Sequence, residues 1–141
     1  MSDQTKLFTG RLVVLFMIIA LLGFVGVSHA KSSGGISFTG SWSGKGTVRH
    51  QGKRHSISCR VRNTNKVGKV YYSTFRCNIP NLGKGSLTIL VTQKGKNRYT
   101  GSFVDEHSTT RVRLSATQRG KRMRVNISSS RWKGHVNLNK R

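Results

Sequence analysis

The strongest constraint on the fold is a two-residue alternation of apolar and polar side chains through residues 36–141. In the segment 57–62, Ile57, Cys59 and Val61 alternate with serine and arginine, and the segment 71–77 repeats the pattern. Successive side chains of a β-strand point to opposite faces, so each segment predicts a strand with one buried face. We find no segment in this part of the sequence with the spacing of an amphipathic helix.

Further segments alternate in the same way, and with the glycine-containing segment 38–48 they bring the number of predicted strands to eight. Their apolar positions are Leu87, Ile89 and Val91; Tyr99, Gly101 and Phe103; Val112, Leu114 and Ala116; Met123, Val125 and Ile127; and Val136 and Leu138.

The connections between these segments indicate an all-β meander. The sequences QGKR, KGKN and RGKR each place a glycine among polar residues, which is typical of short hairpin loops. The only proline, Pro80, lies in a longer connection. Consecutive hairpins without a crossover predict an eight-stranded antiparallel up-and-down sheet, which removes its two edges by closing into a barrel.

The segment FTGSWSGKGTV, residues 38–48, carries three glycines in a predicted strand. Glycine permits sharp bends and the close approach of a neighbouring backbone, both of which a small barrel needs. We therefore expect Gly40, Gly44 and Gly46 to mark bends of the first strand. Trp42 lies between them and is expected to plug one end of the barrel.

The N-terminus has the layout of a secretory signal peptide. Lys6 and Arg11 precede an uncharged apolar run at 12–27, and small residues follow at Ser28 and Ala30. We predict cleavage after Ala30, with export to the periplasm or beyond the cell. The predicted organisation is a signal peptide at 1–30, a flexible lead at 31–35 and one barrel domain at 36–141. The alternative is an uncleaved helix that anchors the protein in the membrane.

Two cysteines, Cys59 and Cys77, both belong to the exported part. An even number of cysteines in an oxidising compartment predicts a disulfide, here on the apolar face of neighbouring strands. Buried free thiols are the alternative. Two isolated cysteines lack the paired spacing of a zinc site, so we predict no bound metal.

The chain is strongly basic, with 26 Lys and Arg against 3 Asp and Glu. Without Lys6, Arg11 and Asp3, the exported part holds 24 basic and 2 acidic residues, a net charge of +22. Such a field attracts anions, and it exceeds what solubility alone requires. The alternative is that the charge reflects solubility or the composition of the host's proteins.

Basic residues in the last three predicted strands occupy the positions that alternate with the apolar ones. They are therefore expected to point to the same outer face. Arginine forks suit phosphate, sulfate and carboxylate groups, so this face predicts a site for an anionic partner. A merely solvated face is the alternative, and Arg60 and Arg62 are expected to lie away from it. The predicted anion-binding residues are Arg111, Arg113, Arg119, Lys121, Arg122, Arg124 and Lys133.

The sequence offers little for catalysis, and we predict neither catalytic residues nor a cofactor. The segment VDEHS at 104–108 brings an acid, a histidine and a serine together, but neighbouring strand residues point to opposite faces. We interpret it as a strand end and turn whose two acids pair with nearby arginines. His50 and His55 flank a hairpin and would face each other, which makes at most a weak metal site.

Several motifs resemble known barrel proteins. GSW in the first strand resembles the Gly-x-Trp signature of the lipocalin and avidin group, also called calycins. GSWSGKGTV, ISCRV, a second RC and YTGSF followed by DE resemble small exported bacterial lipocalin-like proteins of uncharacterised function, over 38–106. The resemblance implies an eight-stranded up-and-down barrel, and it implies a small apolar ligand inside as one activity.

Three functions remain open from the sequence. The first is a non-enzymatic exported protein that binds an anionic envelope lipid, a polysaccharide or another polyanion, with peripheral membrane contact. The second is a lipocalin-type carrier of a small apolar ligand. The third is a five-stranded oligonucleotide-binding barrel with Tyr71, Tyr72 and Tyr99 as stacking residues.

Overall fold

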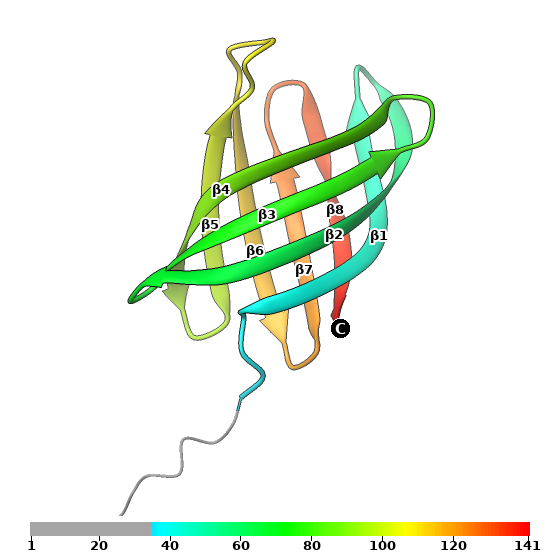
Figure 1. Ribbon diagram of the computed structural model, residues 1–141. Helices are drawn as coiled ribbons and strands as arrows, with labels where there is room; N and C mark the ends of the chain where they lie inside the picture. Colours follow the sequence, from blue (N-terminus) through cyan, green and yellow to red (C-terminus); the bar gives the residue numbers. More distant parts are fainter. Residues whose placement is uncertain (1–34) are drawn as a thin grey trace, which may run out of the picture. The chain divides into compact units, whose positions relative to one another are not determined.

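The computed structural model describes residues 35–141, which form a closed barrel of eight antiparallel strands (Figure 1). Each strand pairs with the next in sequence, and the first pairs with the last. The predicted signal peptide at 1–30 and most of the predicted lead lie outside the described residues. The strands are β1 Gly40–His50, β2 Lys53–Val67, β3 Val70–Ile79, β4 Gly83–Gly95, β5 Arg98–Val104, β6 Arg111–Arg119, β7 Arg122–Ser128 and β8 Trp132–Lys140.

The architecture confirms the predicted up-and-down meander and its strand count. It contradicts the five-stranded oligonucleotide-binding barrel, because eight strands close the sheet. Within residues 35–141 we find no helix with the length and hydrophobicity needed to cross a membrane.

Side chains alternate between the barrel interior and the outer wall, as the sequence pattern predicts. In β6, Val112, Leu114, Ala116 and Gln118 are buried, while the residues between them are exposed. Hydrophobic residues of all eight strands meet inside and form one core cluster. Its buried members are Phe38, Trp42, Val48, Ile57, Cys59, Val61, Ile89, Val91, Tyr99, Leu114, Ala116, Met123, Val125, Val136 and Leu138.

Glycines in β1 allow the barrel to close. Gly44 lies opposite Leu138 of β8, and Gly46 lies opposite Val136. A Cβ atom at Gly44 would collide with the carbonyl oxygen of Asn137, and one at Gly46 would collide with that of His135. The close approach of a neighbouring backbone therefore explains why this strand contains glycine at these two positions.

The predicted disulfide is present. Cys59 of β2 and Cys77 of β3 are direct cross-strand partners whose Cα atoms lie 4.1 Å apart. Cys59 is a buried member of the core, and Cys77 is partly buried and packs against the core. The bridge therefore joins two adjacent strands on their inner face, as their common parity predicts.

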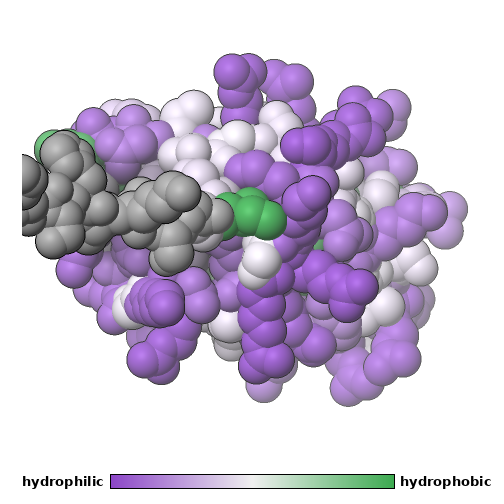
Figure 2. Space-filling view, turned by 90° about the horizontal axis from the view of Figure 1, so that it is seen from below, coloured by the Kyte–Doolittle hydropathy of each residue, from purple (hydrophilic) through white to green (hydrophobic). Residues whose placement is uncertain are grey.

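The chain closes its own barrel at the entry end, by which we mean the end where β1 begins and β8 ends. Phe38 enters the core there, and its ring stacks on Tyr99 with centroids 3.8 Å apart. Lys140 donates hydrogen bonds from Nζ to the carbonyl oxygens of Ser37 and Thr39. Viewed from below, mostly hydrophilic side chains surround this end (Figure 2). Residues 36–39 therefore act as a built-in plug.

Trp42 lies just inside this plug and is fully buried. The Nζ atom of Lys140 lies 4.8 Å from the centroid of the indole ring, close enough for a cation–π interaction. The structure thus places Trp42 in the interior near the entry end, with Phe38 beside it.

Candidate functional site

The seven basic residues predicted to form one anion-binding face are all exposed, and they lie on the neighbouring strands β6, β7 and β8 or in the turn between β6 and β7. Arg111 and Arg113 line a groove of about 620 Å³ together with Lys94 of β4. A second groove, of about 730 Å³, contains three others, Arg119, Arg122 and Arg124. Neither groove is lined by Lys121 or Lys133. Five of the seven predicted residues are therefore divided between two grooves in the outer wall.

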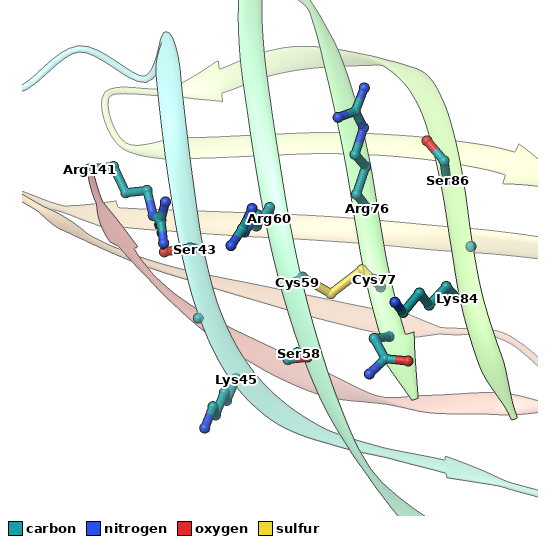
Figure 3. Close-up of a pocket in the computed structure, with 13 residues that line it drawn as sticks. Ser43, Lys45, Ser58, Cys59, Arg60, Arg76, Cys77, Lys84, Ser86 and Arg141 are labelled. Atoms are coloured by element: carbon teal, nitrogen blue, oxygen red, sulfur yellow. Dashed lines mark hydrogen bonds between the residues drawn. A yellow bond between two sulfur atoms is a disulfide. The ribbon is translucent and has the colours of Figure 1, made fainter. Parts of the chain in front are cut away.

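A larger basic groove lies elsewhere, on the outer side of β1 to β4 (Figure 3). It has a volume of about 870 Å³. Five basic side chains line it, and no carboxylate side chain of the described part of the chain does so. We call it the β1–β4 groove. Its basic residues are Lys45, Arg60, Arg76, Lys84 and Arg141.

Strand register arranges the β1–β4 groove in two rows across the sheet. In the first row, Arg60 lies opposite Ser43 on one side and Arg76 on the other. The second row runs from Lys45 through Ser58 and Asn78 to Lys84. The outer wall of four neighbouring strands therefore presents basic side chains together with serine hydroxyl groups and one amide.

Arg141 is held at the rim of the β1–β4 groove. Its Nε donates a hydrogen bond of 2.9 Å to Oγ of Ser43, and its backbone N donates one of 2.9 Å to the carbonyl oxygen of Ser41. These bonds fix the end of the chain against β1. The guanidinium group is thereby positioned beside the first row of groove residues.

Sequence reasoning missed the β1–β4 groove and placed Arg60 and Arg62 outside the expected site. The cysteine pair is the signal that could have found it. If Cys59 lies opposite Cys77 in an antiparallel pair of strands, the residue after Cys59 must lie opposite the residue before Cys77. These two residues are Arg60 and Arg76. Arg62, by contrast, pairs with Thr74 and does not line the groove.

The segment VDEHS forms the end of β5 and the turn that follows. Ser108 Oγ donates to Asp105 Oδ2 at 2.6 Å, and the His107 backbone N donates to Asp105 Oδ1 at 3.1 Å. These two bonds hold the pKa of Asp105 below its ordinary value, with a smaller contribution from the charge of Arg131. His107 contributes its backbone and not its ring to these bonds, so the arrangement is that of a turn.

The histidines of the first hairpin do not face each other. His50 pairs with Lys53 and Trp132, while His55 pairs with Val48. The ring of His50 stacks on that of Trp132, with centroids 3.9 Å apart. Among residues 35–141 we find no group of three or more His, Cys, Asp or Glu side chains that could hold a metal ion.

The three tyrosines do not form a stacking surface for bases. Tyr71 and Tyr99 take part in the plug: Tyr99 stacks on Phe38, and Tyr71 meets Phe38 edge to face at 5.0 Å. Tyr72 alone is exposed, with Lys66 lying 5.3 Å from its ring centroid.

These features define the class of the molecule as a closed eight-stranded up-and-down β-barrel. No model of a known protein family matches the sequence, and no curated protein matches it.

Two solved structures similar to this chain are designed barrels. One is a redesigned β-barrel, mFAP1, bound to DFHBI, with a TM-score of 0.58 and 11% identity; the match covers 72% of this chain and 94% of that one. Another is a fluorescence-activating β-barrel designed de novo, with a TM-score of 0.57 and 10% identity, covering 77% of this chain and 97% of that one. At such identities the likeness shows the fold alone.

Proposed function

We propose that this protein is an exported, non-enzymatic binding protein whose cationic outer wall holds an anionic partner, such as an envelope lipid, an acidic polysaccharide or another polyanion. One observation carries the proposal: three grooves of the outer wall each contain at least three Lys or Arg side chains, and none is lined by an Asp or Glu side chain of the described residues. Anions can therefore enter each of these three grooves without meeting an acidic side chain.

The sequence and the covalent structure agree with this function. The exported part has a net charge of +22, and its two acidic residues are adjacent, at Asp105 and Glu106. A field of one sign raises the local concentration of anions and accelerates their association. The disulfide suits an oxidising compartment, which agrees with the proposed export and with the resemblance to exported lipocalin-like proteins.

The direct test measures binding to an anionic polymer and to vesicles of anionic or neutral lipid at increasing salt. If about six phosphate contacts form, affinity should fall on the order of a thousandfold between about 50 and 200 mM salt, because counterions are released. Neutral vesicles should bind poorly. Equal binding to neutral and anionic vesicles would contradict the proposal.

Charge-matched variants show whether the predicted face takes part. Serine replacements of Arg111, Arg113, Arg122 and Arg124 should lower the salt slope without unfolding the barrel, since all four side chains are exposed. The control replaces four basic residues that line none of the three grooves: Lys53, Arg54, Lys69 and Lys96. Equal loss in both variants would mean that the partner senses total charge alone.

A second function, transport of a small apolar ligand inside the barrel, is favoured by a different observation. Asn63 and Ser73 are cross-strand partners in the interior, and Asn63 Oδ1 and Ser73 Oγ have no hydrogen-bond partner among the described residues. Such atoms cost about 1–3 kcal/mol each, so a polar group of a ligand would be stabilised there. One similar barrel, mFAP1, is described as bound to DFHBI.

This second function predicts saturable binding of a neutral apolar fluorescent probe that is insensitive to salt. Ser73→Val should weaken the binding, whereas the serine replacements on the outer wall should not. Unsaturable or salt-dependent probe binding would contradict it.

A further inference from the structure

The β1–β4 groove contains a pair of arginines whose positions are set by the disulfide. We propose that Arg60 and Arg76 form a clamp for one phosphate group, and that Lys45, Lys84 and Arg141 receive the remaining charge of a compact ligand with two or more phosphates. This inference rests on the proposed function and names the site and chemical class of its partner.

Register sets the spacing of the two arginines. Cys59 and Cys77 lie opposite each other with Cα atoms 4.1 Å apart, which is typical of a close pair without mutual backbone hydrogen bonds. The next pair along an antiparallel ladder is hydrogen-bonded, with Cα atoms about 5.5 Å apart. Arg60 and Arg76 occupy that position on the outer face, because the cysteines point inward.

Two like charges directly opposite each other destabilise a strand pair. No Asp or Glu side chain of residues 35–141 lines the groove to neutralise this pair. The disulfide at the adjacent position prevents the two strands from separating under the repulsion. The backbone positions of the two arginines are therefore held together before a ligand binds, which lowers the entropy cost of binding.

The surroundings of the pair fit a phosphorylated ligand. Guanidinium groups bind phosphate oxygens through two parallel hydrogen bonds, and two facing forks can share one phosphate. Ser58 and Ser86 add neutral hydrogen-bonding groups at the same wall (Figure 3), and Asn78 also lines it. A volume of about 870 Å³ exceeds what one phosphate fills and lies within the range of sites for small organic ligands.

Arg49 and Arg54 provide an internal control. They are also direct cross-strand partners with exposed side chains, but they line none of the three grooves and have no disulfide beside them. This pair carries the same charge as Arg60 and Arg76 but lies outside the β1–β4 groove.

The binding test uses tripolyphosphate as a probe in calorimetry at physiological salt. We expect one site per chain, with R60Q/R76Q weakening it at least tenfold and R49Q/R54Q weakening it less than threefold. Circular dichroism confirms that both variants fold. Equal effects of the two variants, or several equivalent sites per chain, would overturn the clamp.

Tripolyphosphate that displaces phosphatidic acid vesicles identifies a lipid headgroup as occupant, whereas vesicles that bind alongside it identify a soluble one; either result supports the site.

The two proposals fail differently in these measurements. If the anionic polymer still binds with a steep salt dependence while both double variants lose affinity equally, the clamp is wrong and the proposed function stands. If neither the polymer nor tripolyphosphate binds, both are wrong.

A redox measurement tests the role of the disulfide. Opening the bridge lets the repelling strands separate, so removing one arginine should make the oxidised form harder to reduce. In glutathione buffers at low salt, we expect R76Q to shift the midpoint of reduction toward more reducing conditions than the wild type or R122Q. An unchanged midpoint in R76Q would contradict the proposal that the disulfide holds the two strands together against the repulsion between the arginines.

Discussion

The indole nitrogen of Trp42 donates a hydrogen bond of 2.9 Å to the carbonyl oxygen of Phe38. The amide nitrogen of Asn63 donates to the same oxygen at 3.1 Å, so two buried donors from different strands share one acceptor. Gln118 Nε2 donates a further hydrogen bond of 2.6 Å to the carbonyl oxygen of Ile36. The residues that precede the first strand are thus attached to the core, and they close the entry end of the barrel.

Trp42→Ala should lower the free energy of unfolding by about 3–5 kcal/mol, because it removes a fully buried aromatic side chain and leaves a cavity. Trp42→Phe keeps most of the ring and loses the bond to Phe38, so it should cost less. Urea denaturation followed by circular dichroism measures both values. Wild-type stability of the alanine variant would contradict the buried position of the indole.

Gly44→Ala should destabilise the barrel by about 3 kcal/mol, since its methyl group would collide with the backbone of β8. Gly52→Ala is a useful comparison because a Cβ atom there meets nothing within 4 Å; its cost comes only from a positive φ of 77°. Thermal unfolding should therefore show a larger loss for Gly44→Ala. An equal loss would mean that backbone conformation, not closure between β1 and β8, requires the glycine.

The turn after β5 should make stability depend on pH in the acid range. The pKa of Asp105 is lowered from 3.8 in the folded state, chiefly by the hydrogen bond from Ser108. Its contribution is therefore complete above about pH 4 and is lost as the pH falls through the lower folded value. Asp105→Asn should be less stable than the wild type at neutral pH, and the difference should vanish in acid. Glu106→Gln is the control and should preserve the acid dependence.

Mass spectrometry of the exported protein, intact and after reduction and alkylation, tests the predicted processing and the disulfide together. We expect a chain that starts at Lys31 and takes up alkylating reagent only after reduction. A chain that retains Met1 would contradict cleavage. Alkylation of both cysteines before reduction would contradict the bridge.

Loss of the bridge should also be visible in stability. Cys59→Ala should cost about 2–5 kcal/mol, as removal of a native disulfide does in small secreted domains. Urea denaturation of the oxidised wild type, the reduced wild type and the variant measures the effect. Similar midpoints for all three would show that strand pairing alone holds β2 to β3.

The alternation of residue types by itself determined the strands, their inner and outer faces and the disulfide. Each of these follows from local spacing: a period of two makes every second side chain of β6 face the core, whatever the rest of the chain does. The same parity places the polar residues Asn63, Ser73 and Gln118 inside. The hairpin loops between consecutive strands are equally local.

Only the tertiary structure decided which residues meet across the barrel. Closure of β1 on β8, the insertion of Phe38 between Tyr71 and Tyr99, and the bond from Arg141 to Ser43 all join residues far apart in sequence. The basic residues show the same division: their parity predicts that they face outward, but the twist and register of the closed sheet distribute them over separate grooves and bring Arg60 opposite Arg76. Local patterning carries no information about these distances, because they depend on how all eight strands pack around one core.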